Sequence, residues 1–124
     1  TIRDGVTSIG DTSFAGCNLT SVIIPNSVTS IDSGAFNECT NLTSVVILDG
    51  VTSIYYGAFS DCKSLASVTI PASVTYIGEN VFNGCSKLTT VKYGGTKAQW
   101  DALINGVDIA LSENAKVEYN YTGE

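Results

Sequence analysis

One apolar pattern recurs at a nearly constant interval along most of this chain. The sequence has four phenylalanines: Phe14, Phe36, Phe59 and Phe82. Successive phenylalanines lie 22, 23 and 23 residues apart, and the four cysteines follow the same steps: Cys17, Cys39, Cys62 and Cys85. A fixed period of this size is the sequence sign of a solenoid, because no single unit can enclose its own apolar side chains. The units must therefore stack on one another.

Each unit carries seven apolar positions in a fixed phase. In the third unit they are Val51, Ile54, Phe59, Cys62, Leu65, Val68 and Ile70. Val68 and Ile70 flank Thr69, which is the alternation of a strand, and a proline follows at positions 25 and 71. The pattern predicts one strand per unit, with successive strands parallel at about 4.8 Å and every phenylalanine in the core.

Parallel stacking in register places equivalent outward side chains above one another. Two outward ladders are expected on this predicted sheet: Ser21, Ser44, Ser67 and Thr90 in one, and Ile23, Val46, Thr69 and Lys92 in the other. A surface rich in hydroxyl groups can hydrogen-bond an extended partner, so these eight residues are the candidate binding site. The alternative is a surface without a ligand, on which threonine is simply a good strand former.

Two segments of the unit leave their conformation open. The V-T-S-I segments fit either a second extended segment or a tight turn. They lie at residues 28–31, 51–54 and 74–77, and the last has Tyr76 in place of serine. The A-F-x-x-C segment is too short for a full helix and has Gly and Asn nearby, so a helical turn or an irregular loop is expected.

The two ends of the chain differ from the repeats. Residues 1–6 align with residues 46–51, so the chain is expected to start inside the strand of a preceding unit. An uncapped apolar end would continue into further repeats or pair with a second copy. We expect one domain over residues 1–124, with a remnant of a repeat at 1–5, four repeats at 6–93 and a C-terminal cap at 94–124.

The cap is predicted to contain a helix and a strand. Thr96 and Gln99 have the spacing of a capping box, and Trp100, Leu103 and Ile104 fall on one face of the helix that follows. Trp100 is therefore expected to cover the end of the core, the alternative being a platform for stacking on carbohydrate. Residues 117–121 alternate like residues 91–93 and should add a last strand to the sheet.

Composition excludes several kinds of chemistry. The chain has no histidine, so neither a Ser-His-Asp nor a Cys-His arrangement exists, and no catalytic residue, cofactor or metal ligand is predicted. The stacked cysteines are expected to stay free and buried, because their Cβ atoms would be too far apart for a disulfide. Glu38 and Asp61 stack on an exposed turn and are interpreted as solvated charges, with a weak cation site as the alternative.

Charge and hydropathy limit the possible partners. The net charge of −6 has the wrong sign for binding nucleic acid, and polar residues interrupt the apolar stretches too often for membrane insertion. The chain is therefore expected to bind neither nucleic acid nor the membrane interior.

The unit resembles the repeat of the BspA-like, or treponemal-type, leucine-rich repeat family. Residues 28–47 and 51–71 follow its V-x-x-I-x(3)-A-F-x-x-C-x-x-L-x-x-V-x-I-P consensus closely, including Ala35-Phe36 to Cys39 and Ala58-Phe59 to Cys62. The resemblance implies a short, curved, right-handed leucine-rich repeat solenoid of the α/β type, mostly β. It also implies a bacterial cell-surface or secreted protein with roles in adhesion and protein binding.

These observations lead to one functional hypothesis and one alternative. The chain is expected to be a module that recognises a protein or another ligand on a host or extracellular surface, and not an enzyme. The alternative is a structural spacer or stalk with no ligand of its own.

Overall fold

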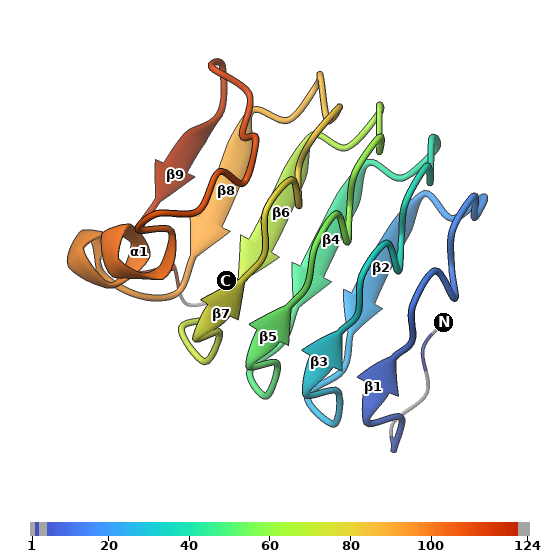
Figure 1. The fold of residues 1–124 in the computed structure, drawn as a ribbon, viewed down its shortest axis with the longest axis horizontal. Helices are drawn as coiled ribbons and strands as arrows, with labels where there is room; N and C mark the ends of the chain where they lie inside the picture. The colour runs from blue at the N-terminus through green and yellow to red at the C-terminus, as the bar shows by residue number, and fades with distance from the viewer. Residues whose placement is uncertain (1, 3–4, 122–124) are drawn as a thin grey trace.

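The computed structural model describes residue 2 and residues 5–121, which form two parallel sheets joined by turns (Figure 1). The larger sheet has the order β2-β4-β6-β8-β9, with strands β2 (Ser21–Ile24), β4 (Ser44–Ile47), β6 (Ser67–Ile70), β8 (Thr90–Tyr93) and β9 (Lys116–Glu118). The smaller sheet has the order β1-β3-β5-β7, with strands β1 (Ser8–Ile9), β3 (Ser30–Ile31), β5 (Ser53–Ile54) and β7 (Tyr76–Ile77). The V-T-S-I segments are thus extended, and they build a second sheet.

The predicted leucine-rich repeat solenoid is confirmed, because equivalent residues of successive units pair directly. Ser21 pairs with Ser44, which pairs with Ser67, which pairs with Thr90. All seven apolar positions of the third unit are fully buried. The rings of Phe36 and Phe59 stack with centroids 5.3 Å apart and planes 5° apart. Phe14 stacks on Phe36 at 5.2 Å but is only half-buried, because it lies at the end of the stack.

The segment around each phenylalanine is a run of tight turns rather than a helical turn. Residues two before and two after each phenylalanine have positive φ: Thr12, Gly34, Gly57 and Asn80 before it, and Gly16, Glu38, Asp61 and Gly84 after it. Amides of these turns donate to the next unit, as Phe36 N–H does to the Ala58 carbonyl at 2.8 Å. The amides between them bond within the turn, as Asn37 N–H does to the Gly34 carbonyl at 3.0 Å, so bonds within and between units alternate along the segment.

The C-terminal cap contains the predicted helix and a shorter form of the predicted strand: β9 ends at Glu118 and not at residue 121, and Asn120 beyond it has a positive φ that a strand does not allow. In α1 (Lys97–Leu103), the Gln99 N–H donates to Thr96 Oγ1 at 3.1 Å and the Thr96 N–H to Gln99 Oε1 at 2.8 Å, which completes the capping box. Trp100 is 3% exposed and packs on Tyr93 with ring centroids 5.1 Å apart. Trp100 thus covers the end of the core, and the carbohydrate-platform alternative is wrong because the ring is buried.

A second closing element of the cap has no counterpart in the sequence pattern. The Asn80 N–H donates to the Asp108 carbonyl at 2.9 Å, and the Phe82 N–H donates to the Ile109 carbonyl at 3.0 Å. These carbonyls stand where the turn of a further unit would stand, and the Ile109 side chain is 4% exposed. The turn ladder is therefore closed by residues 108–109.

The N-terminal end of the stack is more open. Residues 1, 3 and 4 of the proposed repeat remnant lie outside the described residues. Ile2, Val6, Ile9 and Phe14 are the apolar residues around a hollow of about 410 Å³ at this end. Residues 2 and 5–121 contain one helix, α1, and its seven residues are too few to cross a bilayer.

Candidate functional site

The outer face of the larger sheet carries the predicted binding residues. Register pairing confirms the first ladder, Ser21, Ser44, Ser67 and Thr90, and also the second, Ile23, Val46, Thr69 and Lys92. The side chains between them, such as Val22 and Val45, point inward and are buried. The structure therefore brings all eight predicted residues onto one continuous surface.

Strand β9 extends both ladders by residues that the sequence analysis did not include. Lys116 pairs with Thr90, and Glu118 pairs with Lys92. The alternation that predicted this strand also gives these two outward positions, so the signal was present in the sequence. Lys116 and Glu118 are exposed, and they complete the candidate surface.

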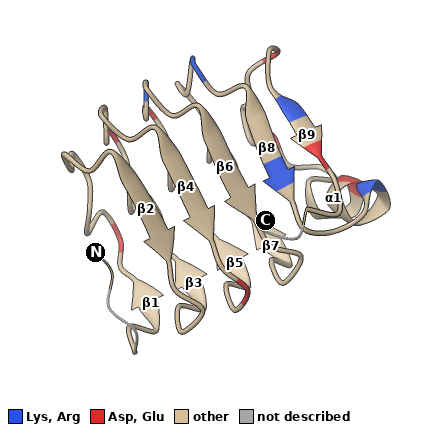
Figure 2. Cartoon of the chain, turned by 180° about the vertical axis from the view of Figure 1, so that it is seen from behind, with Lys and Arg blue, Asp and Glu red and all other residues tan. Residues whose placement is uncertain are grey.

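Charge is distributed unevenly over this face. Figure 2 shows β2, β4 and β6 without a charged residue, whereas β8 and β9 carry both signs. The uncharged half includes Ile23 on β2, the first strand of this sheet, and Ile23 is 61% exposed. A partner would therefore meet an aliphatic and hydroxyl-bearing half beside a charged half.

The hydroxyl groups of this face differ from those at the strand entrances. Thr43 Oγ1 donates to the Thr20 carbonyl at 2.9 Å, and Thr52 Oγ1 donates to the Thr29 carbonyl at 3.2 Å, so these hydroxyls hold successive units together. Among the described residues, the hydroxyls of the first outward ladder bond to no protein group. Because they are not used within the fold, they are available to hydrogen-bond a partner.

A groove crosses this face where strands β4 and β6 end. It has a volume of about 290 Å³ and is lined by Val46, Ile47, Leu48, Asp49, Thr69, Ile70, Pro71, Ala72, Gly94 and Tyr121. The Tyr121 N–H donates to the Tyr93 carbonyl at 3.0 Å, and Lys92 Nζ lies 5.1 Å from the centre of the Tyr121 ring. The predicted residues Val46 and Thr69 thus share a groove with Tyr121, which the sequence analysis assigned to the last strand and not to the binding site.

The cysteines support the fold rather than chemistry. All four are free, and three are buried. The Cys62 Sγ–H donates to the Phe36 carbonyl at 3.2 Å, and Cys39 and Cys85 make the same contact with Phe14 and Phe59. Burial raises the pKa of the Cys39 thiol to about 12, so it stays protonated and is a poor nucleophile.

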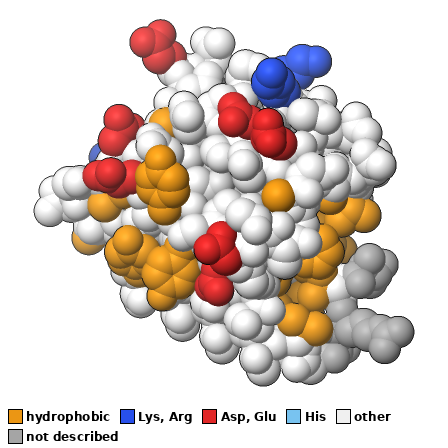
Figure 3. Space-filling model, turned by 45° about the vertical axis from the view of Figure 1, so that its right-hand side comes forward, with side chains coloured by type: hydrophobic (Ala, Val, Ile, Leu, Met, Phe, Trp, Pro, Cys, Tyr) orange, Lys and Arg blue, Asp and Glu red, His pale blue; other side chains and the backbone are white. Residues whose placement is uncertain are grey.

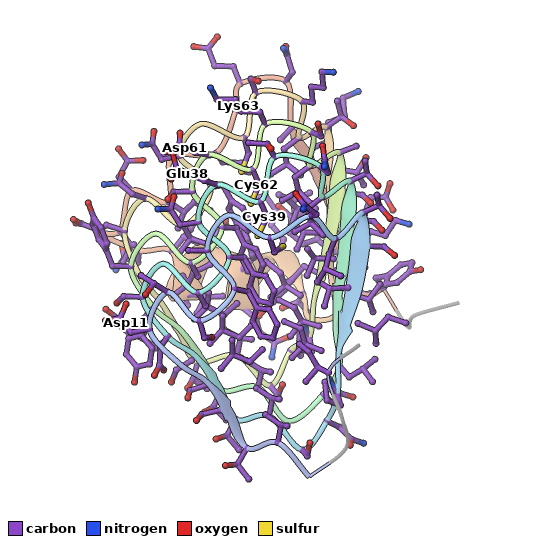
Figure 4. The ribbon with its side chains drawn as sticks, turned by 90° about the vertical axis from the view of Figure 1, so that its right-hand side faces the viewer. Asp11, Glu38, Cys39, Asp61, Cys62 and Lys63 are labelled. Carbon is purple, nitrogen blue, oxygen red and sulfur yellow. The ribbon has the colours of Figure 1, made fainter. Side chains whose placement is uncertain are left out.

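The acidic turn residues gather no further metal ligands. Figure 4 shows Cys39 and Cys62 inside the molecule, with Glu38, Asp61 and Lys63 towards the outside. Within residues 2 and 5–121, no group of three or more Asp, Glu, His or Cys side chains is placed to hold a metal ion. Glu38 and Asp61 occupy the same position of the same turn in successive units, each with φ of 60°, so the repeat of the turn accounts for their stacking.

Comparison with known proteins assigns this repeat to a family. The model described as the BspA type leucine rich repeat region matches residues 1–102 in six copies. The chain belongs to the BspA-type leucine-rich repeat family. Among proteins with curated functions, none matches this sequence.

Solved structures agree with the BspA-type assignment. A leucine rich cell surface protein from Faecalibacterium prausnitzii A2-165 is 32% identical over 90% of this chain, with a TM-score of 0.63. The pneumococcal vaccine antigen PcpA is 21% identical over 91% of this chain, with a TM-score of 0.60, and supports the fold alone. This BspA-type chain spans 35% of the first structure and 26% of the second.

Proposed function

We propose that this chain is a protein-recognition module of a bacterial cell-surface or secreted protein, and that it contacts its partner through the outer face of the larger sheet. The observation that carries the proposal is the ladder of hydroxyls with no bond inside the fold, on strands β2, β4 and β6, which carry no charge and lie next to a groove. A surface needed only for solubility would more often carry charge there.

Each part of the face has a role in this proposal. Ile23 and Val46 are aliphatic side chains that a partner would bury, and such burial is the main favourable term in protein association. The hydroxyls of Ser44 and Ser67 would bond polar groups of the partner. Lys92 and the charged residues of β9 would set its orientation, because charges at the rim of an interface contribute mainly to steering and register.

The cellular location is inferred from a relative. The Faecalibacterium protein is a leucine rich cell surface protein, and this chain matches about a third of it. We therefore place the module within a longer exported protein, where it would bind a protein of the host or of another extracellular surface in adhesion. Catalysis is not part of the proposal, since the Cys39 thiol stays protonated and the sequence has no histidine.

A charge-insertion experiment tests the proposal. The chain is immobilised and its binding to a set of purified extracellular-matrix proteins is measured by biolayer interferometry. Val46→Lys should weaken the tightest interaction by at least about tenfold, because a long charged side chain that must lose its water would replace an aliphatic one that the partner buries. Ser86→Lys adds the same charge on an exposed turn and should leave binding unchanged.

The opposite outcome would favour the spacer. If Val46→Lys and the matching substitutions at Ser44 and Thr69 all bind as the unchanged chain does, the outer face of the larger sheet is not the interaction surface. Thermal unfolding of each variant should show an unchanged midpoint, so that a loss of binding reports on the surface.

A further inference from the structure

Three exposed tyrosines gather on the other side of the molecule. Tyr76 is the first residue of β7, at a position where the other short strands carry serine, and Tyr55 and Tyr56 follow β5. Their exposed fractions are 40% for Tyr55, 58% for Tyr56 and 49% for Tyr76. These three residues, called the tyrosine surface below, belong to neighbouring units, and stacking brings them together.

The tyrosine surface is partly ordered by contacts of its own. The rings of Tyr55 and Tyr76 lie with centroids 5.4 Å apart and planes tilted by 45°. Asn80 Nδ2 donates to the Tyr56 hydroxyl at 3.3 Å. Each ring nevertheless keeps about half of its area in water, although aromatic rings release much free energy when they are buried. Fold stability alone does not account for their placement.

Acidic groups adjoin the Tyr55 ring. A hollow of about 380 Å³ is lined by Tyr55, Asp11, Asp32, Ser30 and Ser33. Glu79 occupies the same place in its unit as Tyr56 does in the preceding one. Figure 3 shows orange side chains next to red ones on this side of the molecule. Among the described residues, no lysine pairs with these carboxylates, because the ion pair that these residues form joins Lys97 to Asp101 on α1.

This combination selects for a cation that can stack. The face of a tyrosine ring attracts a cation within about 6 Å of its centre, and a guanidinium stacks on it better than an ammonium does. Carboxylates beside the ring supply charge-assisted hydrogen bonds to the same group. The chain already uses such a contact, because Lys92 Nζ lies over the Tyr121 ring. A neutral sugar would also stack on tyrosine and could donate hydroxyl hydrogen bonds to these carboxylates, but it would not gain the attraction between opposite charges that a guanidinium gains.

We propose that the tyrosine surface binds an arginine side chain of a partner protein, with the guanidinium on the Tyr55 ring, which Tyr76 supports by packing on it, and bonded to Asp32 or Asp11 in the hollow beside that ring. The inference deepens the proposed function, since it names the chemistry of a protein partner, but it uses the face opposite the larger sheet. The two surfaces can therefore fail separately.

A peptide titration tests the arginine site directly. The probe is a fluorescein-labelled pentapeptide of alternating glycine and arginine, and the control peptide has citrulline, which is uncharged, in place of arginine. Fluorescence anisotropy should show binding of the arginine peptide that weakens as salt rises from about 0.05 to 0.5 M, because exposed charges are screened. The citrulline peptide should bind at least about fivefold more weakly.

Single substitutions test the rings and the carboxylates of this site separately. Tyr55→Ala and Tyr76→Ala should each weaken binding of the arginine peptide by about three- to fivefold. Tyr55→Phe keeps the ring and should change the affinity by less than about twofold. Asp32→Asn should weaken binding and flatten its salt dependence, and Val46→Lys on the larger sheet should have no effect. Equal binding of both peptides, no binding of the arginine peptide, or binding of cellotetraose in its place would overturn the proposal.

Discussion

Phe14 and Phe59 occupy equivalent positions in different units, so one substitution can compare the end of the stack with its interior. Phe59 is fully buried and has two ring neighbours, Phe36 at 5.3 Å and Phe82 at 6.2 Å between centroids. Phe14 is half-buried and has one, Phe36 at 5.2 Å. The same change to alanine should therefore have unequal costs.

The expected magnitudes follow from burial and ring contacts. Replacing Phe59 by alanine should lower the free energy of unfolding by about 3–5 kcal/mol, as for other fully buried phenylalanines. Replacing Phe14 should lower it by about 1–2 kcal/mol, because part of the ring is already in water and one stacking contact instead of two is lost. The difference between the two variants should exceed about 1 kcal/mol, the scale of one aromatic pair.

Urea unfolding followed by far-ultraviolet circular dichroism measures both costs. Each variant should unfold in a single transition at a lower urea midpoint, with Phe59→Ala shifted further. Equal shifts for the two variants, or a larger shift for Phe14→Ala, would refute the reasoning that the interior units depend on neighbours on both sides.

Three further predictions concern the thiols and the two ends. The folded state holds the Cys39 thiol proton more tightly than the unfolded state does, so this group contributes its full stabilisation below pH 9.0 and loses it as pH rises towards about 12. The free energy of unfolding in urea should therefore be lower at pH 10.5 than at pH 8, and Cys39→Ala should reduce that difference. Trp100→Ala should cost about 3–5 kcal/mol in the same assay, while Lys97→Ala should change little. Light scattering should show self-association at high concentration, reduced by Val6→Glu; a strict monomer contradicts it.

The repeating part of the fold could be predicted because each unit repeats the same pattern. The seven apolar positions of residues 51–70 are all buried, and the two outward ladders follow from their alternation and the parallel stack. Capping chemistry predicted α1, because Thr96 and Gln99 have a spacing that satisfies two free amides.

Features that occur once were beyond this kind of reasoning. Ile109 closes the last turn through its carbonyl, a contact of the backbone that requires no sequence likeness to the unit it replaces. Tyr76 was noted only as a departure from the serine of the repeat, and Tyr55 has no equivalent tyrosine in the other units, so a search for recurring residues gives neither of them a role. The V-T-S-I segments stayed ambiguous because two-residue strands are too short to show an alternation.

The proposed role of the larger sheet can be tested at the level of single methyl groups. Methyl and amide NMR spectra of the isotopically labelled chain are recorded while the tightest-binding extracellular-matrix protein is added. The proposal predicts that the methyl signals of Ile23, Val46 and Thr69 shift or broaden first. Changes confined to residues on the turns around Phe36 and Phe59, with those three methyl groups unaffected, would contradict it.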